Sequence, residues 1–261
     1  MNRLLKTTAA ASLLVTGALA IAAAMPGASA KEPVTKSAPL HSYILLDRTG
    51  SMEPMWKEAL SSVNAYAEGL AQLDGAHRHV DADITLAAFD SQDGMQFNVL
   101  RDSVDPSRWK KVTNEDVTPR GMTPLYDAIG RIVALAEKDK PAKAVIVIMT
   151  DGEENSSKEM TKKAATAALD RARAKGWEVV FLGAEFSNFR DAEGVGQTAS
   201  RNMAVGKDQL HETMQRLSKK SQDYATGAAP TVEFNAEDRA IAKEDDVKSR
   251  TQGQSPNRSQ R

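Results

Sequence analysis

Short, continuous runs of hydrophobic residues recur along the chain and predict buried strands. Three such runs are "SYILL" ahead of Asp47, "KAVIVIMT" ahead of Asp151, and "WEVVFLGA". Continuous apolar runs of this length are typical of parallel strands that are covered on both faces. The alternating run "DADITLAAFD" predicts a further strand, and the turn-forming "SQDG" joins it to "MQFNVL" in an antiparallel hairpin. A weaker strand is expected around "NMAVG".

The segments between these strands have helical periodicity, with apolar residues three or four positions apart. The longer patterns predict helices over residues 53–73, 125–140, about 157–175, and 208 to about 224. A short polar helical segment is also expected after "WEVVFLGA". Because strands and helices alternate, we predict a three-layer α/β fold with a mostly parallel central sheet, helices on both faces, and one antiparallel edge hairpin. In such sheets, ligands bind in the loops at the carboxyl ends of the strands.

The N-terminal 30 residues have the composition of a secretory signal peptide. A basic start, "MNRLLK", precedes the short apolar stretch "LLVTGALAIAAAM" and the small-x-small motif "ASA" that ends at Ala30. The apolar stretch is short and rich in alanine for a membrane span, although a retained anchor is the alternative. We therefore expect cleavage near Ala30, a polar linker over 31–37, and a periplasmic or secreted protein that meets the membrane only during export.

The chain changes character again near its C-terminal end. Residues 228–261 are polar, mixed in charge and almost free of large apolar side chains. We expect this tail to be disordered, with at most a transient helix across "AEDRAIAKE". One folded domain is thereby predicted over residues 38–227, which is an ordinary domain size.

Composition excludes several classes of function. Of the 261 residues, 26% are charged, and the formal net charge is −1, so no basic surface for nucleic acid is expected. An aromatic content of 5% also offers little for base stacking. The chain has no cysteine, which excludes cysteine nucleophiles, thiolate zinc sites and iron–sulfur clusters.

Three loops carry oxygen-bearing side chains that suit a hard cation. "DRTGS" places Asp47, Thr49 and Ser51 on alternate positions, Thr123 lies in "GMTPL", and Asp151 opens "DGEEN". Magnesium prefers six oxygen ligands in a tight octahedron. Since this set brings only two carboxylates to a doubly charged ion, the ion would stay electrophilic enough to accept one more anionic oxygen from outside.

These three segments, in this order in an alternating β/α chain, resemble the von Willebrand factor type A (vWA) domain and its metal-ion-dependent adhesion site. The resemblance covers roughly residues 38–227 and implies a Rossmann-like vWA fold. It implies that Thr49, Ser51 and Thr123 are direct or near-direct hydroxyl ligands, and that Asp47 and Asp151 hold the ion through ordered water. Thr49 departs from the family pattern, which most often has serine there.

The resemblance also implies the function and the partner. It predicts an exported, non-catalytic binding module that uses Mg²⁺, or Mn²⁺ or Ca²⁺, for metal-dependent protein–protein interaction in adhesion, recruitment or envelope assembly. A protein partner would complete the metal shell with a Glu or Asp carboxylate.

Other interpretations of the same residues remain open at this stage. The "DRTGS" residues and Thr123 could be helix caps and turn residues. An enzyme alternative is a magnesium-dependent phosphatase or hydrolase with Asp47 as nucleophile, although Thr49 stands where that class has its general acid. A third alternative is a purely structural ion, with binding on another face.

Several neighbouring residues also have two possible roles. Asp127 could support the site from behind or be a surface carboxylate. Met52 and Met122 could form an apolar rim for a partner or fill the core. Arg48 and Arg120 could offset the acidic residues of the same loops.

Overall fold

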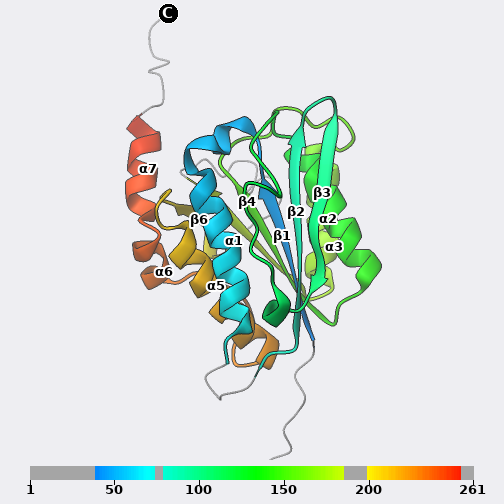
Figure 1. The fold of residues 1–261 in the computed structure, drawn as a ribbon, viewed down its shortest axis with the longest axis vertical. Coiled ribbons are helices and arrows are strands. Elements are labelled where there is room, and N and C mark those ends of the chain that lie inside the picture. Colours follow the sequence, from blue (N-terminus) through cyan, green and yellow to red (C-terminus); the bar gives the residue numbers. More distant parts are fainter. Residues whose placement is uncertain (1–38, 74–78, 185–198, 254–261) are drawn as a thin grey trace, which may run out of the picture. The chain divides into compact units, whose positions relative to one another are not determined.

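A six-stranded sheet in the order β3-β2-β1-β4-β5-β6 organises the part of the chain that the structure describes (Figure 1). The structure is a computed structural model, and it describes residues 39–73, 79–184 and 199–253, all within the unit Lys36–Arg261. Strand β3 runs antiparallel to β2, and the other neighbouring strands are parallel. The strands are β1 Leu40–Asp47, β2 Ala82–Ser91, β3 Met95–Val104, β4 Lys143–Thr150, β5 Glu178–Ala184 and β6 Asn202–Val205.

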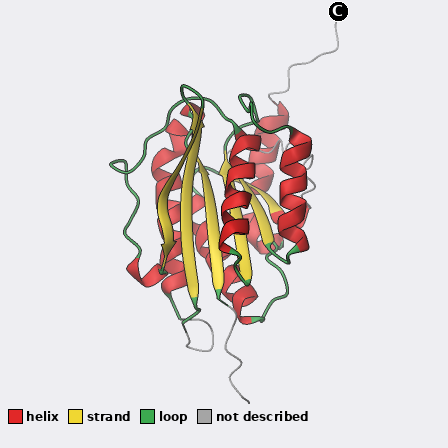
Figure 2. Ribbon diagram, turned by 90° about the vertical axis from the view of Figure 1, so that its right-hand side faces the viewer, coloured by secondary structure: helices red, strands yellow, loops and turns green. Residues whose placement is uncertain are grey.

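Helices cover both faces of this sheet, as Figure 2 shows from the side. The α-helices are α1 Trp56–Ala71, α2 Leu125–Asp139, α3 Lys162–Ala174, α5 Leu210–Thr226, α6 Ala236–Ile241 and α7 Glu244–Gly253. Shorter 3₁₀ segments are η1 Gly50–Met55, η2 Pro106–Arg108 and η3 Ala199–Arg201. The predicted three-layer α/β class, with one antiparallel edge hairpin, is therefore confirmed. In the described ranges, no helix is both long enough and apolar enough to cross a bilayer.

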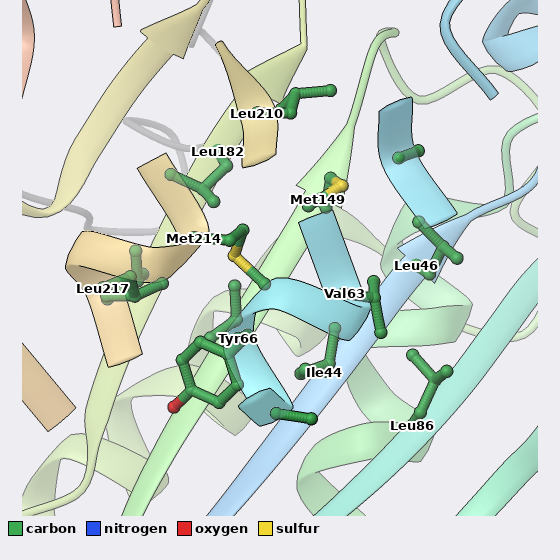
Figure 3. Close-up of a cluster of buried hydrophobic side chains, with 14 of the residues drawn as sticks. Ile44, Leu46, Val63, Tyr66, Leu86, Met149, Leu182, Leu210, Met214 and Leu217 are labelled. Atoms are coloured by element: carbon green, nitrogen blue, oxygen red, sulfur yellow. The ribbon is translucent and has the colours of Figure 1, made fainter. Parts of the chain in front are cut away.

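The alternation of side chains along the buried strands separates two hydrophobic cores. In β1, Ile44 and Leu46 face the core under α1 and α5, whereas Tyr43 and Leu45 face the core under α2 and α3. Figure 3 shows the first of these cores, where Tyr66 of α1 lies among side chains from the sheet and from α5. A continuous apolar run is thus required in β1, because this strand has no solvent-exposed face.

Two helices begin later than their sequence pattern predicts. The first helical segment starts as η1, which contains Pro54, and becomes α-helical only at Trp56. The third helix begins at Lys162 rather than near residue 157. The reason is that side-chain carboxylates bind the backbone N–H groups of this stretch. Glu154 accepts from the Ser157 N–H and Asp127 from the Lys158 N–H, so these groups do not enter a helical ladder.

The prediction of a disordered C-terminal tail is wrong for residues 228–253. Val232 and Phe234 are buried in the core under α1 and α5, and the segment continues into α6 and α7. Few apolar residues are sufficient here, because they cover the edge of an existing sheet rather than build a core of their own. Residues 254–261, the expected signal peptide and linker, and the polar helical segment expected after β5 lie outside the described residues.

Buried charges in this C-terminal segment are paired. Glu244 is almost fully buried and accepts hydrogen bonds from the Ala204 N–H of β6 and from the Arg239 guanidinium. Although burial acts in the opposite direction, the hydrogen bonds from Arg239 and Lys248 hold the pKa of the Glu244 carboxyl below its ordinary value. The segment is therefore fixed to the sheet edge by both packing and ion pairing.

Gly69 marks a close contact between α1 and α5 and provides a test of their packing. A Cβ at this position would lie 2.9 Å from the Ser218 Cβ and would overlap its Oγ. We expect Gly69→Ala to destabilise the fold by about 1–3 kcal/mol, because overpacking outweighs the gain in helix propensity. Urea denaturation of the purified protein measures this change.

Gly130 in α2 is the matched control for that experiment. The three atoms nearest to a Cβ there all belong to the flexible side chain of Met160, first its Sδ, which can move away. Gly130→Ala should be neutral or stabilising by up to about 1 kcal/mol. Equal destabilisation of the two variants would contradict the proposed close approach of α1 and α5. The second variant Ser218→Gly should restore the stability of Gly69→Ala.

Candidate metal centre

The three oxygen-bearing loops meet at the end of the sheet that is formed by the carboxyl ends of β1 and β4. Helix α1 begins at this end (Figure 1). Strands β1 and β4 are parallel neighbours, and their register pairs Leu46 with Met149. Asp47 and Asp151 therefore emerge side by side from the carboxyl ends of these strands. Thr123 joins them from the loop that precedes α2.

All five residues predicted as metal ligands belong to one hydrogen-bonded cluster. Ser51 Oγ donates to Asp151 Oδ1 at 2.8 Å and lies 3.1 Å from Thr49 Oγ1. The Thr123 Oγ1 is 3.4 Å from Thr49 Oγ1. Asp47 accepts the Thr49 N–H at 2.8 Å through its Oδ1. The hydrogen bond from Ser51 to Asp151 alone joins residues that are 100 positions apart in the sequence.

The separations between these oxygens suit a divalent cation. Two adjacent ligands of an octahedral Mg²⁺, each at 2.0–2.1 Å from the ion, are about 3 Å apart, and the spacing is wider for Ca²⁺. The oxygen pairs described above are 2.8, 3.1 and 3.4 Å apart. In the described ranges no group of three or more His, Cys, Asp or Glu side chains could hold a metal. A cation at this site would therefore depend on the hydroxyl groups.

The two carboxylates lie in an environment that disfavours their ionised forms. Asp47 is fully buried, and burial raises its pKa to about 7, with Asp151 adding to the rise and hydrogen bonds from Thr150 and Thr49 opposing it. Burial likewise raises the pKa of Asp151, against the hydrogen bond from Ser51. A bound cation would supply the positive charge that favours both ionised forms.

The hydroxyl groups of Thr49 and Thr123 do not cap the helical segments that follow them. Thr49 precedes η1 and makes no side-chain capping bond, and α2 is preceded by Pro124 instead of being capped by Thr123. The Thr49 hydroxyl lies within hydrogen-bond distance of the Ser51 and Thr123 hydroxyls. Their orientation is that expected of a shared binding site.

Three supporting residues were not identified from the sequence. Thr150 donates its hydroxyl to Asp47 Oδ2 at 2.7 Å. Asn155 accepts the Thr123 N–H at 2.8 Å through its Oδ1, and its own N–H donates to the Thr123 carbonyl. Glu154 accepts the Tyr126 N–H. All three residues lie close to Asp151 in the sequence "TDGEEN", which could have indicated a supporting role. Only the folded structure, however, places this loop against α2.

Asp127 is not a surface carboxylate, which was one of the two roles considered for it. It is buried at the start of α2, and its carboxylate accepts the backbone N–H groups of three consecutive residues, 158–160. It therefore fixes the loop that follows Asp151 rather than pointing into solvent. The two methionines also differ, since Met52 is fully buried and the Met122 residue is 52% exposed.

The position of Asp47 does not suit a nucleophile. Its carboxylate is completely buried, and each of its oxygens already accepts a hydrogen bond, from the Thr49 N–H and the Thr150 hydroxyl. A nucleophilic oxygen must instead reach a substrate atom directly. The geometry therefore gives no support to the phosphatase alternative.

The sheet order, the helices on both faces and the cluster of loops define a vWA-like α/β fold. No protein-family model matches the sequence, and no curated protein sequence is detectably similar to it. Comparison with solved structures, in contrast, finds many chains of the same fold.

One such structure is the vWF domain of the type V pili tip protein Mfa5 from Porphyromonas gingivalis. It matches with a TM-score of 0.54 and 11% identity, over 72% of this chain and 97% of that domain. The pilus adhesin SpaC from Lactobacillus rhamnosus GG in its open conformation matches with a TM-score of 0.56 and 12% identity, over 72% of this chain.

A third match is the D319A mutant of the PilB minor pilin from Streptococcus sanguinis, with a TM-score of 0.51 and 12% identity over 76% of this chain. The matches cover 30% of the SpaC chain and 65% of the PilB chain, so this chain spans less than two thirds of either protein. At these identities the likeness establishes the fold alone.

Proposed function

We propose that this protein is a vWA-type binding module that holds a divalent cation at Asp47, Thr49, Ser51, Thr123 and Asp151 and uses it to bind a protein partner. The observation that carries the proposal is the convergence of three hydroxyls and two carboxylates from three distant loops. Mg²⁺ is the favoured ion because the oxygens are closely spaced, with Mn²⁺ and Ca²⁺ as alternatives.

Neutral hydroxyl ligands explain how the ion would serve in recognition. With three neutral hydroxyls and only two carboxylates, whose charges at most balance its own, a bound cation would still accept a further anionic ligand. It would attract a carboxylate oxygen from outside, which is the role proposed for a Glu or Asp of the partner. The module would then act in adhesion, recruitment or envelope assembly without catalysis.

The proposed setting is outside the cytoplasm. The solved structures that share the fold include a pilus adhesin, a pili tip protein and a minor pilin by name. Together with the N-terminal segment that has the composition of a signal peptide, these neighbours favour an exported protein. Edman sequencing of the exported protein would test cleavage near Ala30.

Calorimetric titration with MgCl₂ tests the cation site. We expect saturable binding by the wild-type protein and at least about tenfold weaker binding by Thr123→Val, which removes one hydroxyl but keeps the side-chain shape. Thr226→Val is the matched control, because its hydroxyl donates to carbonyls of Gln222 and Asp223 within α5. No saturable binding of Mg²⁺, Mn²⁺ or Ca²⁺ by the wild type would refute the site.

A pull-down from envelope extract then tests the role of the ion. We expect a partner to be retained in Mg²⁺, to be released by a chelator, and to be lost with Thr123→Val. Partner binding that survives both treatments would favour a structural ion and a binding surface elsewhere.

A further inference from the structure

We propose that Arg120 forms a second anion-binding contact beside the cation site, so that the preferred partner is an acidic segment with two carboxylates. This inference rests on the proposed cation-dependent function and extends it to the chemistry of the partner. One carboxylate would bind the cation and the other would bind the Arg120 guanidinium.

A buried carboxylate holds the Arg120 side chain in place. Its Nε donates to Asp90 Oδ2 at 3.2 Å, and the Asp90 side chain is fully buried at the end of β2. The same Asp90 oxygen also accepts from Arg48 Nε, and the Gln92 N–H donates to Asp90 Oδ1. The guanidinium of Arg120 is thus anchored at one end rather than free to rotate in solvent.

The charges of this cluster do not balance. Asp90 provides one negative charge, whereas Arg48 and Arg120 provide two positive charges. Arg48 cannot offer its charge to a ligand, because its side chain is only 8% exposed and also donates to Asn98 Oδ1. The remaining positive charge therefore belongs to Arg120, whose side chain is 42% exposed.

Backbone hydrogen bonds place Arg120 on the rim of the candidate metal centre. Its N–H donates to the carbonyl of Arg48, which lies between Asp47 and Thr49, at 2.7 Å. The next carbonyl, that of Gly121, accepts the Gly50 N–H at 3.2 Å. Gly121 itself has φ +70° and packs against the backbone of residue 91, so the loop has little freedom to move away.

The terminal nitrogens of Arg120 take no part in its hydrogen bond to Asp90. Within the described residues, the hydrogen bond of Arg120 to Asp90 uses Nε, and no bond from its two Nη groups is found. A guanidinium that is held through Nε alone can bind a carboxylate through both of its Nη groups. Exposed Met122, two residues further on, adds an apolar surface next to the charge. An acidic segment with a neighbouring apolar residue fits these features.

Short synthetic peptides can separate the two anion contacts. The probes are N-acetylated, C-amidated peptides with two glutamates separated by zero, one or two glycines, each compared with an analogue in which the second glutamate is glutamine. Binding to the ¹⁵N-labelled full-length protein is followed by NMR in Mg²⁺ and in EDTA. We expect the best diacidic peptide to bind about tenfold more tightly than its analogue, and only in Mg²⁺.

Substitutions of Arg120 give the decisive comparison. Arg120→Gln should abolish the preference for two carboxylates. It should leave the affinity for the single-glutamate analogue unchanged, and the affinity for Mg²⁺ unchanged or slightly higher. Arg120→Lys should restore part of the preference, since it keeps the charge but not the planar fork. Arg108→Gln is the matched control, because exposed Arg108 lies after β3, near the start of β2 and away from the cation site.

The outcomes distinguish this inference from the function on which it rests. If both peptides bind equally well and both require Mg²⁺, the Arg120 contact is overturned and the cation-dependent function stands. If neither peptide binds in a Mg²⁺-dependent way, both are overturned. A preference that persists in Arg120→Gln, with Mg²⁺ binding intact, assigns the second contact to another residue and also overturns the inference.

Discussion

Asp47→Asn is expected to weaken Mg²⁺ binding by about 100-fold while leaving the metal-free protein at least as stable as the wild type. The loss of affinity follows because the substitution removes one of only two carboxylate charges at the cation site, and even supporting groups of metal sites contribute about 10–100-fold. Isothermal titration with MgCl₂ measures this part of the prediction.

The stability of the metal-free variant has a separate physical reason. Asp47 is fully buried and has no Lys or Arg ion-pair partner in the described ranges, so its charge is costly without a cation. An asparagine side chain has the same shape, with an oxygen to accept the Thr49 N–H and an amide group to face the Thr150 hydroxyl. Urea denaturation in EDTA should therefore show no loss of free energy of unfolding.

Asp127→Asn is the matched control, because Asp127 is also a buried aspartate in the same region. Its two oxygens accept three backbone N–H groups, so an amide nitrogen in place of one oxygen would leave a donor facing a donor. This variant should lose about 1–3 kcal/mol of stability. If Asp47→Asn destabilised the metal-free protein as much as Asp127→Asn, Asp47 would be a structural residue rather than a cation-site residue.

Ending the chain at Gly227 is expected to cost at least about 5 kcal/mol of stability, which would leave a domain of ordinary stability largely unfolded. The deletion removes buried Val232 and Phe234 from the core, and truncation of a buried phenylalanine alone costs about 3–5 kcal/mol. It also removes the Val232 N–H that donates to Glu178 Oε2, and burial already raises the pKa of Glu178.

Circular dichroism and urea denaturation of the shortened chain measure this effect. Phe234→Ala in the full chain should lose about 3–5 kcal/mol, whereas Glu233→Ala, at the neighbouring exposed position, should change stability by less than about 0.5 kcal/mol. A shortened chain as stable as the full one would show that the domain ends near residue 227, as its composition indicates.

Much of the fold and of the candidate site could be predicted from local sequence patterns. The continuous apolar runs predicted the buried strands, and the "SQDG" turn predicted the antiparallel hairpin of β2 and β3. Asp47 and Asp151 were placed together because the carboxyl ends of neighbouring parallel strands lie at the same edge of a sheet. The structure brings the five candidate residues together, and their role as metal ligands remains a prediction.

What could not be predicted depends on contacts between distant residues. The start of α3 shifts because carboxylates from residues 127 and 154 bind its upstream N–H groups. The C-terminal segment lacks the apolar content of an independent domain, but it folds where the edge of β6 and the partly formed core offer a surface. Composition shows how many apolar residues a segment contains, but it does not show whether another part of the protein offers a surface on which they can pack.

The sequence by itself determined most of the strands and helices before residue 228, and which oxygen-bearing residues stand at strand ends, because these depend on local periodicity and chain connectivity. Only the tertiary structure decided that Asp47 is wholly buried, that Thr150 holds it, and that Asp90 neutralises Arg48 and leaves Arg120 exposed. These properties arise from burial and from hydrogen bonds and ion pairs between residues more than 25 positions apart in the sequence. Burial and pairing decide whether a charged side chain is available to a ligand.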